Sequence, residues 1–410
     1  MRSRLLLFVV PNHNWMARSW GRPVNRYLRQ VGLSALWKTG LLILCCCSLP
    51  EGPTVKIDSV NGVKRILNQP PPETKLLHTA SNRLFSIDGA PNSPFVQIWD
   101  AVSDTAGRLF VVDAGLKRIL MYDAEGRYVR AIGSEGEGPG EFRWPARAAV
   151  GADTLWVWDL ANRRLSGFLP SGELANDITL PHIRTVSAIA WSPTSHLVAQ
   201  VGPFWTSPPG SDDGVVRLMT LLTGDTILRW EDRESSVVST RPGMSSVVAI
   251  PFRPKPIWAI APDGTISWSD GKEYRILQYD ARGRLLQTIE RKVRPVPVSR
   301  GELDSIHREL DAVTEEVRNR IVIPETKAAI SQILISASGD LWVNIPESRT
   351  SPPTQRWDVF ASDGVLRFFV RLPPTIRVRG IARSYVFGVE RDSLDQEHIV
   401  AVRLLASIPP

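Results

Sequence analysis

A stretch of β-rich runs and turns, residues 107–145, constrains the fold of this chain more than any other feature. Three short runs, 108–113, 117–123 and 127–132, are separated by tight polar turns that contain glycine. Runs of this length joined by such turns predict an antiparallel meander. The connection that follows, residues 133–142, is too rich in glycine to form a regular element.

The same pattern recurs along the chain. The run Thr154–Asp159 repeats the run that ends at Asp113, with the aspartate in the same place 46 residues later. This spacing is typical of one blade of a β-propeller. Further copies begin near residues 186, 256, 330 and 379, and the last copy has only three strands. A lone strand, 83–87, precedes the first copy, so we expect it to complete the sixth sheet and close a ring, which protects sheet edges.

One segment, residues 299–320, does not follow the strand pattern. Its apolar residues recur at steps of three and four, with acidic residues between them: Leu303, Ile306, Leu310, Val313 and Val317. This periodicity predicts an amphipathic helix with Ser299 near its N-cap. Because the segment lies between the fourth and fifth copies, we expect a helical insertion that lies across one face of the domain.

The motifs in residues 107–145 are Gly-x-Leu-Phe-Val-Val-Asp, Arg-Ile-Leu-x-Tyr-Asp-x-x-Gly and Gly-x-x-Gly-x-Gly-Pro-Gly-x-Phe-x-x-Pro. They resemble the NHL-type repeat, and most of all that of exported bacterial six-bladed β-propeller proteins, many of which are lipoproteins. The resemblance implies an all-β fold, a six-bladed β-propeller over residues 81–410 with the helical insertion between blades four and five. It says little about function, because such propellers include binding scaffolds and enzymes.

The N-terminal segment, residues 1–47, is typical of an export signal. A basic region precedes an apolar run, 40–47, that is too short to span a membrane and ends in Cys45, Cys46 and Cys47. An apolar run ending in cysteine resembles the bacterial lipoprotein signal, so one of these cysteines is a candidate for lipidation. The alternative is a secretory leader that is cleaved nearby, and translation could start at Met1 or Met16.

Residues 48–80, which contain Pro70, Pro71 and Pro72, are expected to be a linker from the signal to the folded body. The expected location is therefore the periplasm or the cell surface. Contact with the membrane is expected through the N-terminal anchor only.

The net charge of +7 comes from this leader. Residues 1–50 hold seven lysines and arginines and no acid, so the remaining chain is formally neutral. A neutral body has no general electrostatic attraction for polyphosphate, and nucleic acid is therefore not an expected partner.

Several patterns could indicate a catalytic or metal site, but in each case the spacing or the repeat favours a structural role. The acidic, glycine-rich residues 133–141 lack the spacing of a phosphate or calcium loop, so we interpret them as a blade-to-blade crossover. Asp113, Asp159 and Asp270 recur with the repeat and are expected to bind turn amides. The histidines show no metal-site spacing. We therefore predict no catalytic residue, metal or cofactor.

A basic ring is the strongest functional candidate. Five cations fall at or just before the innermost strands, whose ends form the channel mouth: Arg147, Arg184, Arg253, Lys255 and Arg379. Such a ring could bind an anionic group of a carboxylated sugar or a peptide terminus. The alternative is that these are solvated strand ends paired with nearby acids. Tryptophans at Trp144, Trp191, Trp205 and Trp258 could add a sugar-stacking surface, or belong to the core.

The predicted function is that of a monomeric, exported, membrane-tethered scaffold. Its loop face is expected to bind a protein, peptide or glycan of the cell envelope. The alternative function is that of a propeller hydrolase or lyase with its site at the mouth of the central channel.

Overall fold

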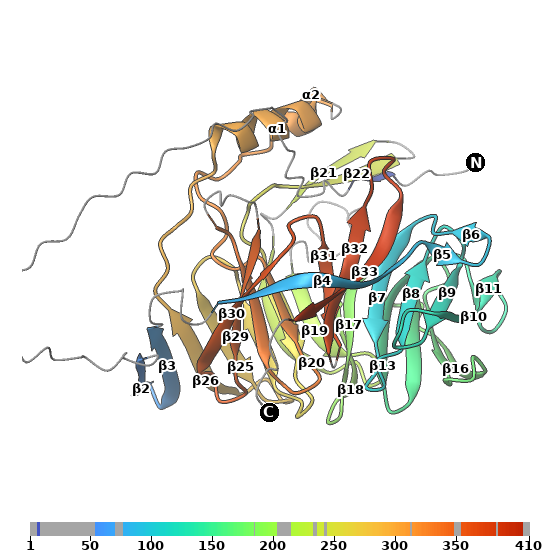
Figure 1. Cartoon of the computed structure of the whole chain (residues 1–410), viewed down its shortest axis with the longest axis horizontal. Coiled ribbons are helices and arrows are strands. Elements are labelled where there is room, and N and C mark those ends of the chain that lie inside the picture. Colours follow the sequence, from blue (N-terminus) through green and yellow to red (C-terminus); the bar gives the residue numbers. More distant parts are fainter. Residues whose placement is uncertain are drawn as a thin grey trace, which may run out of the picture.

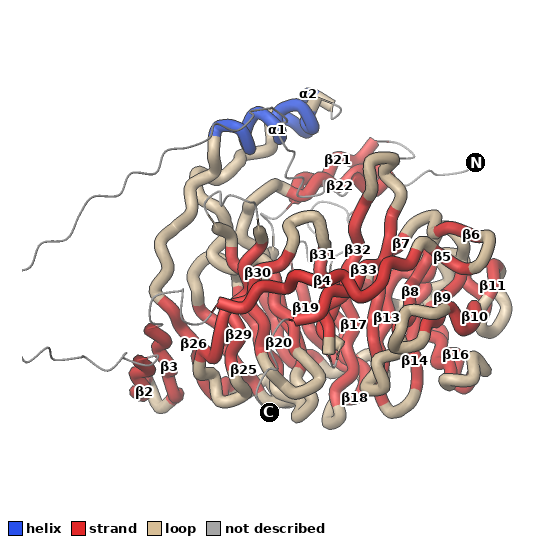
Figure 2. The backbone as a smooth tube through the Cα atoms, viewed as in Figure 1, coloured by secondary structure: helices blue, strands red, loops and turns tan. Residues whose placement is uncertain are grey.

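The structure is a computed structural model that describes residues 6–8, 54–69, 77–183, 185–202, 215–232, 236–241, 244–311, 314–347, 354–382 and 384–404. Its regular elements are almost all strands, and most of them belong to six radially arranged sheets (Figures 1 and 2). Within each sheet, consecutive strands pair antiparallel, as the tight turns between the runs predicted.

The first three sheets have four strands each. Blade one consists of β7 (Ile98–Ser103), β8 (Leu109–Asp113), β9 (Arg118–Tyr122) and β10 (Tyr128–Ile132). Blade two consists of β13 (Pro145–Gly151), β14 (Thr154–Asp159), β15 (Arg164–Phe168) and β16 (Leu174–Thr179). Blade three consists of β17 (Val186–Ser192), β18 (His196–Val201), β19 (Val215–Thr220) and β20 (Thr226–Glu231).

The last three blades recruit strands from the N-terminal part of the chain. Blade four contains β23 (Ile257–Ile260), β24 (Ile266–Ser269), β25 (Arg275–Tyr279) and β26 (Leu285–Arg291). Blade five contains β27 (Gln332–Ile335), β28 (Leu341–Ile345), β29 (Gln355–Phe360) and β30 (Leu366–Leu372). Blade six contains β31 (Arg377–Ile381), β32 (Tyr385–Arg391) and β33 (Glu397–Leu404), and β4 (Leu77–Ile87) is its outer strand.

The innermost strands form a closed ring. Each of β7, β13, β17, β23, β27 and β31 contacts the next, and β31 contacts β7 again. The strand β4 closes the ring, because its residues 80–87 pair antiparallel with β33 while its residues 77–79 pair parallel with β30. The protein is therefore a six-bladed β-propeller in which the predicted strand 83–87 pairs within blade six.

The hydrophobic core lies between neighbouring blades. The core between blades six and one contains Phe387 and Ile399 on one side and Val111 and Tyr122 on the other. Middle strands are buried on both faces, and every residue of β8 is buried. This packing explains why runs such as Leu109–Asp113 are continuously apolar rather than alternating.

The chain segments that link one blade to the next gather on one face, which we call the mouth face. They run from the outer strand of a blade to the innermost strand of the following blade. They carry the short pairs β5 (Gly89–Ala90) with β6 (Ser93–Pro94) and β11 (Ser134–Glu135) with β12 (Glu141–Phe142). They also carry the hairpin of β21 (Ser236–Arg241) and β22 (Met244–Ala249), which β1 (Leu6–Phe8) joins. Figure 1 shows β21 and β22 on the same side of the ring as the helices.

The segment 299–320 forms two short helices rather than one long helix. The helix α1 (Arg300–Leu310) begins at a capping box in which Ser299 and Glu302 bind each other's backbone, and α2 (Glu315–Arg318) follows. Both lie in the chain between β26 and β27. Their buried residues Ile306, Leu310 and Val317 pack on the loop before β23, at Ile250 and Phe252. Neither of the described helices has the length and apolar character that a membrane crossing requires.

Two further elements differ from the sequence-based expectation. Part of the expected linker 48–80 forms a hairpin of β2 (Thr54–Val60) and β3 (Val63–Gln69), and β3 pairs parallel with β26 of blade four. The first repeat also has an innermost strand, β7, which the sequence pattern did not reveal. Both elements pair with strands that are distant in sequence or carry few strongly apolar residues, so local pattern does not indicate them.

Candidate anion site at the channel mouth

The innermost strands share an irregularity at the point where they enter the channel. The pairing register shifts between Ile98 and Asp100 in β7, between Pro145 and Arg147 in β13, and between Val378 and Gly380 in β31. Each shift is a β-bulge, which adds one residue to the strand and re-aims the neighbouring side chains. Arg147 follows the bulge of blade two, and Arg379 is itself the extra residue in blade six.

Arg147 is held against the inner wall by backbone carbonyls. Its Nε donates to the carbonyl oxygen of Ser187 at 2.5 Å, and one of its terminal nitrogens donates to that of Ala146 at 2.7 Å. Its guanidinium also lies 5.7 Å from the centre of the Trp99 ring. Burial lowers the pKa of Arg147, and the negative charge of Asp100 opposes that shift. The side chain keeps part of its surface accessible, as expected for a group that lines a narrow channel.

Arg379 differs from Arg147 because it has no acceptor. Its Nε is buried without a hydrogen-bond partner, and no described residue forms a hydrogen bond or ion pair with its side chain. Burial lowers its pKa, the carboxylates of Asp100 and Glu397 oppose this, and the positive charge of Arg147 adds to it. Arg147 and Arg379, which we call the mouth pair, are therefore close enough to repel each other.

Asp100 stands near both arginines without pairing with either. One of its oxygens accepts the N–H of Ala101 at 2.9 Å, and the other accepts the N–H of Ala148, on β13, at 3.1 Å. The carboxylate therefore joins blades one and two through backbone N–H groups. Arg147 and Arg379 are both half-buried, and only the Nε of Arg379 is buried without an acceptor. Because a cation that is partly removed from water is costly without a counter-charge, a further negative group would stabilise the mouth pair.

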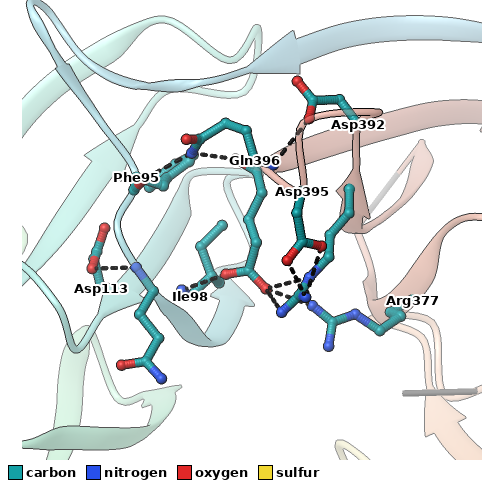
Figure 3. A network of polar contacts seen from close by, with 10 residues as sticks. Phe95, Ile98, Asp113, Arg377, Asp392, Asp395 and Gln396 are labelled. Carbon is teal, nitrogen blue, oxygen red and sulfur yellow. Dashed lines mark hydrogen bonds and ion pairs between the residues drawn. The ribbon is translucent and has the colours of Figure 1, made fainter. Parts of the chain in front are cut away.

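A second group of charges beside the mouth pair is fully paired. Glu397 accepts the N–H of Ile98 at 2.7 Å, and its other oxygen accepts from Arg377 at 2.7 Å and from Arg391 at 3.1 Å. Figure 3 shows part of this network, and Arg391 also donates to Asp395 at 3.0 Å. These contacts fasten blade six to the first strand of blade one. Arg377 and Arg391 therefore already have anionic partners, unlike Arg379.

The structure brings together two of the five cations predicted to form a ring. Arg253 lies in the loop before β23 as a half-buried residue, and Lys255 is exposed in the same loop. Arg184 and the cysteines Cys45, Cys46 and Cys47 lie outside the described residues.

The recurrent aspartates Asp113 and Asp159 accept hydrogen bonds from the backbone of turns, as their position in the repeat predicted. Asp113 accepts backbone N–H groups from Val96, Gln97 and Leu116 at 2.8–3.1 Å. Asp159 accepts four, at 2.7–3.0 Å, from Arg143, Trp144, Ala161 and Asn162. Each carboxylate thus ties the incoming crossover to the next turn of the same blade. Among the described residues, no three His, Cys, Asp or Glu side chains gather as a metal site would require.

Comparison with known proteins agrees with this topology. Residues 92–187 match the model of a family described as a six-bladed β-propeller. The family match and the strand topology give the same fold. No curated protein matches the sequence.

Among solved structures, a candidate exported protein of Bacteroides fragilis has a TM-score of 0.49 at 12% identity, over 81% of this chain and 99% of that one. A Bacteroides vulgatus protein has a TM-score of 0.49 at 9% identity, over 79% and 96% of the two chains. The virginiamycin B lyase of Staphylococcus aureus has a TM-score of 0.38 at 11% identity, over 83% and 85%.

The sequence placed both arginines of the mouth pair among its candidates but did not indicate Asp100. The sequence also did not indicate the β-bulges, one of which contains Arg379. Asp100 lies in the run Ile98–Ser103, whose single aspartate between apolar residues was the one available signal. A bulge has no sequence signature in these strands, because the extra residues Trp99, Ala146 and Arg379 share no chemistry.

Proposed function

We propose that this protein is a non-catalytic binding scaffold that receives an anionic group of a protein, peptide or glycan at its mouth face. The observation that carries the proposal is the guanidinium of Arg379, whose Nε is buried and which has no acceptor among the described residues. A ligand anion between Arg379 and Arg147 supplies the missing counter-charge and strong, charge-assisted hydrogen bonds.

The surface around the mouth pair supports a macromolecular partner. Two large apolar side chains stand exposed on this face, Val96 (63% exposed) before β7 and Leu394 (85% exposed) between β32 and β33. Exposed apolar residues on the same face as an unpaired cation suit a partner that buries the apolar side chains and brings its negative charge to the cation. The linking segments on the same face can vary without disturbing the sheets.

A photo-crosslinking amino acid placed at Leu394 tests the proposal in the intact cell envelope. Leu222 is the matched control, because it is a large apolar residue, 49% exposed, in the turn between β19 and β20 on the opposite face. We expect a defined adduct from position 394 that disappears in the double variant Arg147→Gln and Arg379→Gln. Equal adducts from both positions, or turnover of a hydrolase or lyase substrate that depends on the mouth pair, would argue against the scaffold.

We further infer that the repeats are of the NHL type and that the chain is an exported, monomeric lipoprotein anchored through one of Cys45, Cys46 and Cys47. The support is the basic leader with its apolar run ending in three cysteines. Metabolic labelling with a fatty acid tests the anchor. We expect label in the wild type and none after all three cysteines are changed to serine; label that persists in the serine variant would exclude this anchor.

A further inference from the structure

We infer that the group bound by the mouth pair is a single carboxylate, carried by an acidic sugar or by a peptide. This inference rests on the proposed function and narrows its ligand. It depends on three features of the site: the donors that remain free, the way Asp100 is fixed, and the charge balance of the cluster.

The free donors form a fork. A guanidinium has five N–H groups in one plane, and no described residue accepts from those of Arg379. Arg147 has committed its Nε and one N–H of a terminal nitrogen to backbone carbonyls, which leaves its other terminal nitrogen available. A planar fork matches the two oxygens of a carboxylate, with Arg147 offering an additional donor.

Asp100 limits how the site can be filled from within the protein. Both of its oxygens accept backbone N–H groups, from Ala101 and Ala148, so the carboxylate cannot turn to the arginines without leaving these donors unpaired. Glu397 is committed in the same way to Ile98, Arg377 and Arg391. Neither of the two described acids nearest to Arg379 is therefore free to turn toward it, and we assign the missing partner to a ligand.

The charge balance favours a monoanion. The cluster around the mouth contains four arginines, Arg147, Arg377, Arg379 and Arg391, and three acids, Asp100, Asp395 and Glu397. One negative charge makes this group neutral. A phosphate that carries two charges leaves an excess next to Asp100, and like charges in a partly dry site repel. A carboxylate therefore fits better than a phosphate.

Calorimetry with sodium acetate and inorganic phosphate tests this chemistry on the full chain. We expect acetate to bind with a dissociation constant of about 1 mM, the scale for a ligand of so few atoms, and phosphate to bind at least tenfold more weakly. Arg379→Gln should weaken acetate binding by about tenfold or more. Arg143→Gln is the control, because Arg143 is an exposed cation in the crossover before β13; it should leave acetate binding unchanged.

Two further calorimetric comparisons distinguish a carboxylate on a sugar from one on a peptide. Glucuronate is compared with glucose, and a short peptide with a free C-terminus is compared with its amidated form. If glucuronate alone binds more tightly than acetate, the carboxylate belongs to a sugar. If the peptide with a free C-terminus alone binds more tightly than acetate, the carboxylate belongs to a peptide. Equal binding of the charged and uncharged forms contradicts the inference.

Thermal stability separates a ligand site from a structural one. If Arg379 only stabilises the fold, Arg379→Met lowers the melting temperature. If it is a ligand group that remains unpaired without ligand, removing its buried charge raises the melting temperature of the ligand-free protein by about 4 °C. The wild type, but not Arg379→Met, should then be stabilised by acetate.

Failure of this inference can be told apart from failure of the proposed function. Phosphate binding as tight as acetate binding, or a melting temperature that falls in Arg379→Met, overturns the carboxylate assignment. In either case, an envelope adduct from position 394 that depends on the mouth pair still supports the scaffold.

Discussion

At the scale of single residues, this propeller uses buried carboxylates in two ways. Asp113 and Asp159 occupy the same place in successive repeats and are satisfied by backbone N–H groups. Asp100 is satisfied in the same manner but stands beside two cations that it does not bind. The first two residues hold the fold together, whereas the third has its oxygens on backbone N–H groups and forms no ion pair with the mouth pair.

Replacing Asp159 with alanine should be among the most destabilising single changes in the chain. Four backbone N–H groups lose their acceptor, which we expect to lower the free energy of unfolding by about 4 kcal/mol. Asp270 is the matched control, because it has the equivalent repeat position but accepts one N–H group from the described residues, that of Lys272. Asp270→Ala should cost less than about 1 kcal/mol in urea unfolding. Similar losses for both would show that repeat position, not hydrogen bonding, matters.

His398 should give the protein a pH-dependent stability. Burial lowers its pKa, but contacts with Asp88 at 2.8 Å and Asp392 at 3.2 Å outweigh this and raise the pKa above the ordinary value of 6.5. The stabilisation is therefore complete below pH 6.5 and is lost as pH rises through the folded-state pKa. Because Asp88 is largely exposed, we expect less than about 1 kcal/mol.

The measurement is the melting temperature between pH 5.5 and 8.5. The wild type should lose stability relative to His398→Gln over the upper part of this range. A constant difference between the two proteins across the range would contradict the assignment of a raised pKa.

At the scale of elements, the strands β2, β3 and β4, which we call the strap, connect three blades. The strand β3 pairs with blade four, and β4 pairs with blade five and then with blade six. Asn68 fixes the strap to the β29–β30 turn, because its side chain donates to the carbonyl oxygen of Gly364 and accepts the N–H of Leu366. These contacts join the N-terminal strands of the propeller to blades four, five and six, which come last in the sequence.

Removing the Asn68 side chain should loosen the strap. Both hydrogen bonds are buried, so Asn68→Ala should lower the free energy of unfolding by about 2 kcal/mol. The neighbouring Gln69 is exposed, and Gln69→Ala should change it by less than about 0.5 kcal/mol. Hydrogen exchange of residues 54–69 should increase in the first variant only; exchange that is unaffected would mean that the strap is held by β3–β26 pairing alone.

Substitution of Gly364 tests how tightly β3 packs against blade four at this point. A Cβ at this position, where φ is +85°, would lie 2.8 Å from Ile66 Cδ1 and 3.0 Å from Ile289 Cγ1. Gly224 has a similar φ of +79° with no atom within 4 Å. Gly224→Ala should therefore cost about 1 kcal/mol from backbone strain alone, and Gly364→Ala about 2 kcal/mol more because the core must also shift. Equal costs would show that Ile66 and Ile289 yield freely.

At the scale of the whole molecule, the repeat predicted the fold because each unit is a local meander with its own turns. The crossover 133–142 and the role of Asp113 and Asp159 could likewise be predicted, since they recur with the unit. The hairpin at 54–69, the bulges and Asp100 could not, because they depend on pairing between distant strands. The site exists only where blade six meets blades one and two.

We propose above all that the mouth pair of this six-bladed propeller binds a carboxylate. The most direct measurement is a crystal structure of the protein grown with acetate as the only carboxylate present. We expect acetate bound by the guanidinium of Arg379, with Arg147 as a second donor and Asp100 still accepting from Ala101 and Ala148. A structure in which Arg379 forms an ion pair with Asp100 or Glu397, and leaves acetate no place between the two arginines, would contradict it.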